Sequence, residues 1–142
     1  MKPTNLTYQI IDHTADLGIA VKGADAKDLF ANAAYAMIDI MVETDRVGSE
    51  AKRRIAIEGE DYPDLMVRWL GEILYLFDAE KEVVRDIEIT DLGSNRLEAV
   101  LAFMSLEEGG YEIKMEIKAV TYHQISVERK NGEWEARIIF DI

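Results

Sequence analysis

The spacing of apolar residues changes along the chain, and each change marks a different element. Short apolar runs rich in β-branched residues occupy residues 8–11 and 17–22, on either side of the polar sequence DHTAD at residues 12–16. Runs of this length and composition are typical of strands joined by a turn. The first two elements are therefore expected to be a pair of strands.

Two longer segments repeat their apolar residues with the period of a helix. The first begins at Asp25, a suitable N-cap, and the second at Asp61, with Pro63 in its first turn. The apolar stripes are Leu29, Phe30, Ala33, Met37, Ile40 and Met41 in the first helix and Leu65, Met66, Trp69, Leu70, Ile73, Leu76 and Phe77 in the second. The second stripe is wide enough to cover a sheet, so its members are expected in the core.

Most of the remaining chain has strand character. Residues 53–58 alternate apolar and charged side chains, residues 83–89 and 96–104 flank turn residues 91–95, and residues 117–129 meet residues 133–142 across Asn131-Gly132. This pattern predicts an α/β fold of the α+β type, in which two helices pack on mostly antiparallel β-sheet and a β-hairpin ends the chain. No repeat or linker divides residues 1–142, which are expected to form a single compact domain.

The turn at Asn131-Gly132 sets the register of the predicted hairpin. If the two residues flanking this turn face each other, Tyr122 lies opposite Asp141 and His123 lies on the apolar face as a partly buried ring. Asp141 then belongs to the more polar face. Lys118 reaches the same end of the sheet, provided that its strand contains no bulge.

Net charge limits the partners that the chain can bind. It has 28 acidic and 16 basic residues, a net charge of −12. Such a charge repels phosphate backbones and anionic membranes, so direct, tight nucleic-acid binding and membrane binding are not expected. The chain has no cysteine and no apolar stretch near the ~18 residues of a membrane span, and we expect a cytoplasmic protein.

Carboxylates gather at the predicted C-terminal strand end. Asp141 and the α-carboxylate of Ile142 are two hard oxygen donors that suit Ca²⁺ or Mg²⁺. Asp12 and Asp16 are candidates for a third ligand, although the spacing of Asp12, His13 and Asp16 matches no metal motif. On spacing alone we prefer a simpler interpretation, in which Asp12 or Asp16 caps a turn and Asp141 is a solvated strand end.

Motifs of known enzymes are missing from the sequence. It contains no G-x-S-x-G, no H-E-x-x-H and no Gly-rich phosphate loop. A structural role is a better prediction than catalysis for both His13 and His123.

Three motifs resemble those of a known family: DHTAD at residues 12–16, IKAVTYH at 117–123 and IIFDI at 138–142. Together with an alanine-rich first helix and the sequence WLGEILYLF at 69–77, they are similar to the archease family over essentially the whole chain. The resemblance implies a small α/β protein that is no enzyme but a protein cofactor of RtcB-type RNA ligases in tRNA splicing. It would promote guanylylation of the ligase, multiple turnover and the use of nucleotides other than GTP.

The resemblance also implies where the site lies. Its metal ligands would be Asp12, Asp141 and Ile142, in agreement with the carboxylate pair above, with Ca²⁺ favoured and Mg²⁺ and Mn²⁺ as alternatives. Other residues that match the family's motifs would form a ligase-activation surface around the ion: His13, Asp16 and Lys118.

Two other classes of function fit the same residues. The first is a metal-dependent hydrolase that uses these carboxylates with His13 as general base. The second is a passive acidic adaptor that docks a basic partner, with any ion only holding the chain ends together. The sequence leaves open the physiological metal, the ligase contact surface and the oligomeric state.

Overall fold

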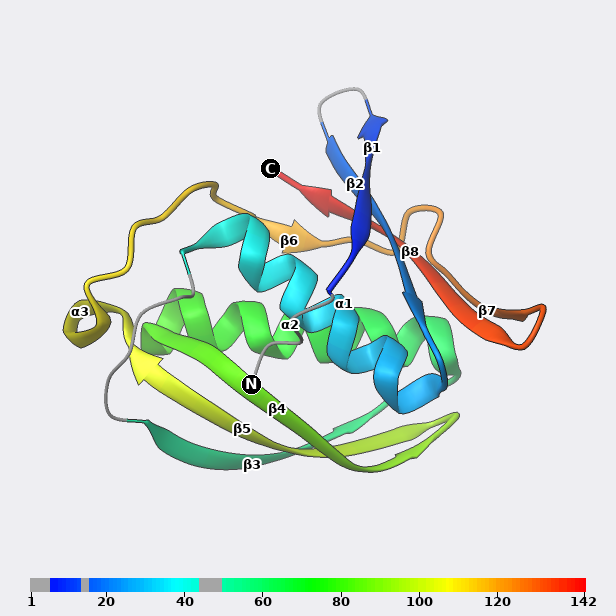
Figure 1. Ribbon diagram of the computed structural model, residues 1–142, viewed down its shortest axis with the longest axis horizontal. Helices are drawn as coiled ribbons and strands as arrows, with labels where there is room; N and C mark the ends of the chain where they lie inside the picture. The colour runs from blue at the N-terminus through cyan, green and yellow to red at the C-terminus, as the bar shows by residue number, and fades with distance from the viewer. Residues whose placement is uncertain (1–5, 14–15, 44–49) are drawn as a thin grey trace.

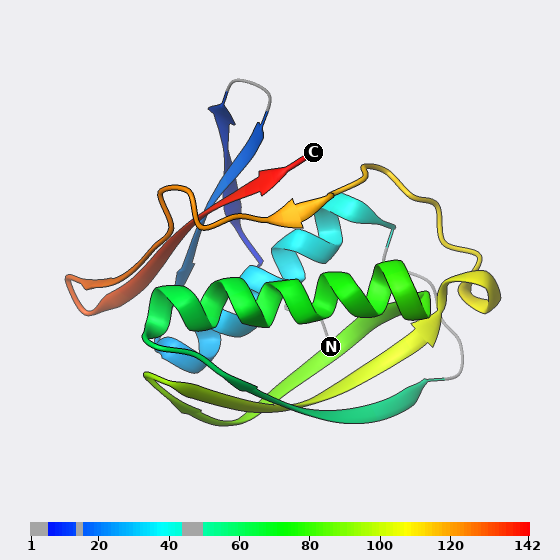
Figure 2. The same ribbon diagram turned by 180° about the vertical axis from the view of Figure 1, so that it is seen from behind.

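The fold has two antiparallel β-sheets with two long helices between them (Figure 1, Figure 2). This computed structural model describes residues 6–13, 16–43 and 50–142, without the side chains of Asp12 and His13. Both long helices contact strands of both sheets, so each helix buries two sides. The α+β fold class and the mostly antiparallel sheet predicted from the sequence are confirmed.

The larger sheet has five strands and contains both ends of the described chain. Its order is β1-β2-β8-β6, and β7 also pairs with β8. The strands are β1 (Tyr8–His13), β2 (Asp16–Gly23), β6 (Ala119–Val120), β7 (Ser126–Lys130) and β8 (Glu133–Asp141). The β7–β8 hairpin turns at Asn131 (φ 53°) and Gly132 (φ 81°), the two left-handed residues that a type I′ turn requires.

The smaller sheet has three strands in the order β3-β5-β4. They are β3 (Ala51–Glu58), β4 (Glu82–Gly93) and β5 (Arg96–Ser105). Strand β4 pairs with β5 as far as Gly93, and its register shifts between Val84 and Asp86 and between Ile89 and Asp91. The predicted turn at residues 91–95 is therefore wrong in its first part: β4 continues four residues beyond the predicted end at residue 89, and the turn is confined to residues 94–95.

Both long helices begin at the predicted caps. In α1 (Ala26–Met41) the Asp25 side chain accepts from the backbone N–H of Asp28, and in α2 (Tyr62–Glu80) Asp61 does the same for Asp64. A third helix, the short α3 (Leu106–Gly109), was not predicted. In the described part of the chain, no helix is long and apolar enough to cross a membrane.

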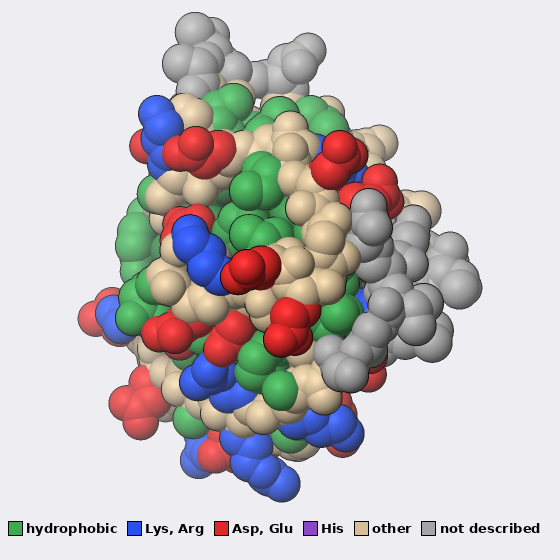
Figure 3. Space-filling view, turned by 90° about the vertical axis from the view of Figure 1, so that its left-hand side faces the viewer, with side chains coloured by type: hydrophobic (Ala, Val, Ile, Leu, Met, Phe, Trp, Pro, Cys, Tyr) green, Lys and Arg blue, Asp and Glu red, His purple; other side chains and the backbone are tan. Residues whose placement is uncertain are grey.

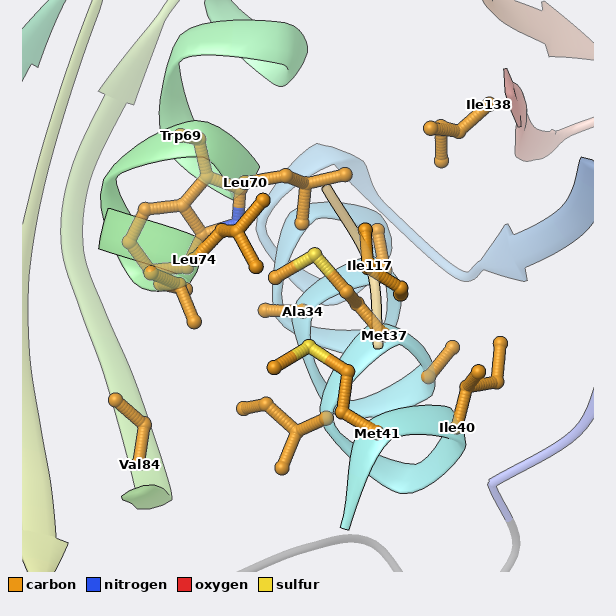
Figure 4. Close-up of a cluster of buried hydrophobic side chains, with 14 of the residues drawn as sticks. Ala34, Met37, Ile40, Met41, Trp69, Leu70, Leu74, Val84, Ile117 and Ile138 are labelled. Carbon is orange, nitrogen blue, oxygen red and sulfur yellow. The ribbon is translucent and has the colours of Figure 1, made fainter. Parts of the chain in front are cut away.

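The core lies where the helices meet between the sheets (Figure 4). Trp69 is fully buried, and its indole N–H donates to the Phe30 carbonyl at 2.8 Å, which joins α2 to α1. Met66, Met37 and Met41 are also buried, as their helical spacing predicted. Trp69 and Met66 are thus packing residues, and their stripe is confirmed as core.

Candidate functional site

Four segments meet at one end of the five-stranded sheet. His13 of β1 lies opposite Asp16 of β2, Asp16 lies opposite Asp141 of β8, and Asp141 lies opposite Ala119 of β6. In Figure 1 the C-terminal end of β8 lies near the start of β2 and the start of β6. Residues more than 120 positions apart in the sequence are therefore neighbours here.

Asp16 and Asp141 form a cross-strand pair of like charges. Asp16 is half-buried and Asp141 is exposed. Carboxylates directly opposite each other in an antiparallel pair destabilise a sheet, and a bound cation removes that repulsion. The donor chemistry at this end therefore fits a hard divalent ion, which prefers carboxylate oxygens.

Lys118 lies at the same end of the sheet, although the unbroken strand on which this prediction depended is interrupted. Its backbone N–H donates to the Asp141 carbonyl at 2.8 Å, which fixes the start of β6 against the end of β8. The Lys118 side chain is exposed, and its ammonium forms no ion pair with any residue that the structure describes. A lysine held this way can meet an anionic group of a partner.

The other predicted site residues are placed only in part. The backbones of Asp12 and His13 belong to β1, with Asp12 opposite Leu17, while their side chains lie outside the described structure, as do residues 14–15. Ile142 is 39% exposed. Among the side chains described, no three Asp, Glu or His come together as a metal site. The set Asp12, Asp141 and Ile142 stays a prediction.

The predicted register at the end of β8 is wrong. Ala119, and not Tyr122, lies opposite Asp141, whereas Ser126 lies opposite Arg137 as predicted. Residues 121–125 leave the sheet between β6 and β7, so the long predicted strand at 117–129 is two strands. His123 falls in this excursion and is exposed, which corrects its expected place on the apolar face.

The 121–125 loop is held by side-chain hydrogen bonds. The Thr121 hydroxyl donates to the Ile139 carbonyl at 2.8 Å, and Gln124 adopts a left-handed φ of 52°. The Tyr122 hydroxyl donates to Asp64 Oδ1 of α2 at 2.7 Å. No pattern in the sequence predicted this contact. Its one local signal was the capping position of Asp64, which says nothing about a partner 58 residues away.

Asp64 has three donors on its two oxygens. Besides Tyr122, the Glu60 N–H donates to Oδ2 at 2.8 Å and Arg68 Nε at 3.0 Å. The Tyr122 hydrogen bond and then these donors lower the pKa of Asp64, and the same bond raises the pKa of Tyr122. The charged form of Asp64 therefore anchors the loop to the start of α2.

The Tyr122→Phe variant should raise the pKa of Asp64, because it removes the first of these donors. A ¹³C NMR titration of the carboxyl groups measures the change in the pKa of Asp64. Tyr75→Phe, on the same helix as Asp64, is the control. A carboxyl group whose pKa is lowered in the folded state stabilises the fold at pH values above its unfolded-state pKa. This stabilisation is lost as the pH falls through the folded-state pKa. The stability difference between Tyr122→Phe and the parent should thus shrink in acid. An unchanged Asp64 titration would contradict the assignment.

In the described part of the chain, a polar contact ties the first strand to the helix layer. The Tyr8 hydroxyl donates to Asp39 Oδ2 of α1 at 2.6 Å. Burial, and then this bond to Asp39, raise the pKa of Tyr8, so the hydroxyl keeps its proton. This contact orients β1, the strand that carries Asp12 and His13.

The sequence of the chain is similar to those of known proteins over most of its length. The model of the Archease protein family matches residues 8–142. Archeases of Archaeoglobus fulgidus and Pyrococcus abyssi are 36% and 35% identical to the chain, each over 140 residues. Those alignments cover 96% and 95% of this chain and 100% and 98% of the relatives.

Two solved structures are also similar. The solution structure of Methanobacterium thermoautotrophicum protein 1598 superposes with a TM-score of 0.79 at 32% identity, over 95% of this chain and 98% of that chain. A crystal structure of a Thermotoga maritima archease, described as a possible chaperone, gives 0.62 at 19% identity, over 93% and 94%, and supports the fold alone.

Proposed function

This chain belongs to the archease family, and on that premise we propose that it is a non-catalytic protein cofactor that activates an RtcB-type tRNA-splicing ligase. In this role it promotes guanylylation of the ligase, allows multiple turnover and broadens nucleotide use. The observation that carries the proposal is the end of the large sheet, where Asp16 faces Asp141 and Lys118 is held beside them.

A divalent ion, Ca²⁺ before Mg²⁺ or Mn²⁺, belongs to this proposal. Asp12, Asp141 and Ile142 would hold it through oxygen atoms, and the ion would supply positive charge between carboxylates that otherwise repel. His13, Asp16 and Lys118 would form the surface around it. Of these, Lys118 has the clearest part, because an exposed ammonium can pair with a phosphate or a carboxylate of the ligase.

The activation mechanism that we propose is a shift of population. A protein that binds the ligase more tightly in its guanylylation-competent conformation increases the fraction of ligase in that conformation. The exposed groups at this sheet end would make the differential contacts. The chain's net charge of −12 leaves RNA binding to the ligase.

A guanylylation assay tests this function directly. Purified ligase is incubated with labelled GTP and an RNA substrate, with and without this protein, under single- and multiple-turnover conditions. We expect the protein to increase the amount of guanylylated ligase and to permit many turnovers per ligase molecule. The protein alone should join or hydrolyse nothing.

Other outcomes would support the alternatives. Hydrolysis of nucleotide or phosphoester by this protein without ligase would favour the metal-dependent hydrolase. Tight binding to the ligase with no change in its turnover would favour the passive acidic adaptor. Either result contradicts the proposed function.

A further inference from the structure

The segment between α3 and β6 has the sequence pattern of a strand with one apolar face. Its odd positions are apolar and its even positions are charged: Tyr111, Ile113, Met115 and Ile117 against Glu112, Lys114, Glu116 and Lys118. Side chains two residues apart in an extended chain point to the same side. Such alternation normally accompanies a face that is covered.

Only the ends of this face are covered. Tyr111 is 8% exposed and Ile117 is 2% exposed, but Ile113 is 57% exposed and Met115 is 38% exposed. Two large apolar side chains two positions apart in the sequence are therefore exposed, whereas ordinary surfaces carry such residues singly. We call residues 111–117 the apolar strip.

The strip is fixed to the end of α1. Ile113 forms an isolated bridge with Val42, and the N–H groups of Lys114 and Met115 donate to the Met41 carbonyl at 2.7 and 3.3 Å. The Glu43 N–H donates to the Glu112 carbonyl at 3.3 Å. The exposed side chains are therefore presented by a backbone that is already bonded on one side.

The charged side chains around the strip are mostly acidic, although Lys114 and Lys118 of the same segment are also exposed. Exposed carboxylates come from α3 and from the strip itself: Glu107, Glu108, Glu112 and Glu116. The strip joins the C-terminal end of α1, the negative end of its dipole, and α1 has no basic residue in its last turn. Figure 3, which faces this side of the molecule, shows hydrophobic side chains at the centre with both acidic and basic side chains around them.

A second copy of the chain fits this surface poorly. Two copies would bring two net charges of −12 together, with α3 glutamates beside both strips. Like-charged surfaces within a Debye length of about 8 Å repel at physiological ionic strength. A basic partner is attracted by the same charges, which also raise its association rate.

We propose that the apolar strip is a docking surface for a segment of the partner protein that carries apolar residues flanked by Lys or Arg. Ile113 and Met115 supply the apolar centre of the contact, and the surrounding glutamates pair with the basic residues at its rim. The surface adjoins the sheet end that carries Asp141, because the strip leads directly into Lys118, whose N–H donates to the Asp141 carbonyl. The test below rests on the proposed function, because it takes the ligase as the partner.

The test measures the dissociation constant of the complex between this protein and the full-length ligase. The variant Ile113→Glu with Met115→Glu keeps the extended backbone but replaces the apolar centre with charge. We expect it to weaken the complex at least about tenfold, the size of effect typical of a central contact. Tyr75→Glu, the same kind of change at a side chain 55% exposed on α2, should leave the affinity unchanged.

Two further measurements separate the outcomes. Hydrogen exchange at residues 112–117 should slow in the complex, and Ca²⁺ binding by the double variant should equal that of the parent. A folded double variant that binds the ligase as tightly as the parent would overturn the docking surface and leave the proposed function standing. Failure of the parent to bind the ligase would overturn both. Sedimentation showing a dimer that the double variant abolishes would assign the strip to a second copy instead.

Discussion

Replacing Asp141 with asparagine is expected to weaken Ca²⁺ binding at least about tenfold and to abolish activation of the ligase, with little effect on the metal-free fold. Asparagine keeps the shape of the side chain but removes the charge that a hard cation prefers. Asp141 is exposed, so the change buries no new polar group. In the absence of metal it also removes the repulsion from Asp16 across the strands.

Asp141→Asn should change the free energy of unfolding in opposite directions without and with Ca²⁺. In EDTA the variant should be as stable as the parent, or up to about 1 kcal/mol more stable. At a Ca²⁺ concentration 100 times the parent's dissociation constant, the parent should gain about 2.7 kcal/mol, whereas a variant that binds tenfold more weakly should gain only about 1.4 kcal/mol. Urea unfolding with and without Ca²⁺ and calorimetric titration measure both effects.

A matched control separates the effect of this site from the effect of removing any single negative charge. Asp78→Asn removes one exposed carboxylate from α2 and should change neither Ca²⁺ affinity nor ligase activation. Lys118→Ala should keep Ca²⁺ binding and lose activation, since its backbone bond to Asp141 needs no side chain. Wild-type Ca²⁺ affinity in Asp141→Asn would remove this residue from the metal site.

Trp69→Ala is expected to cost about 3–5 kcal/mol of unfolding free energy, the largest stability loss of any single change discussed. The indole is fully buried between the helices, and its N–H donates to the Phe30 carbonyl at 2.8 Å. Alanine leaves a cavity in the layer that joins both sheets and removes this hydrogen bond. Domains of this size have about 5–15 kcal/mol in total, so the variant should be marginally stable.

Two controls divide the loss into its parts. Trp69→Phe keeps most of the apolar volume and loses the N–H, and it should cost about 1–2 kcal/mol. Tyr75→Ala, at an exposed position of the same helix, should change the stability by less than about 0.5 kcal/mol. Urea unfolding gives all three values. A Trp69→Ala protein as stable as Tyr75→Ala would contradict the central role of Trp69.

Sequence alone identified those parts of the fold that depend on local interactions. Asp25 and Asp61 mark the starts of the two long helices because an N-cap bonds its own first turn. Asn131-Gly132 marks the C-terminal hairpin because few residues adopt two successive left-handed conformations. The same local patterns identified the core stripes, since burial follows the period of each helix.

The candidate site was predicted mainly from resemblance. Spacing in the sequence could suggest that Asp141 lies at a strand end, but it could not place Asp16 directly across from it. That pairing depends on β8 lying beside β2, a contact between segments about 120 residues apart. No local pattern encodes which strand becomes the neighbour of another.

Only the tertiary structure decided the register at the end of β8. A hairpin pattern extended through residues 121–125 would place Tyr122 opposite Asp141, but the chain leaves the sheet there and Ala119 takes that position. Two hydrogen bonds stabilise the excursion: the Thr121 hydroxyl donates to the Ile139 carbonyl, and the Tyr122 hydroxyl donates to Asp64. They span 18 and 58 residues of the sequence. Local propensity determines where strands and helices form, whereas the free energy of such long-range contacts determines which residues finally face each other.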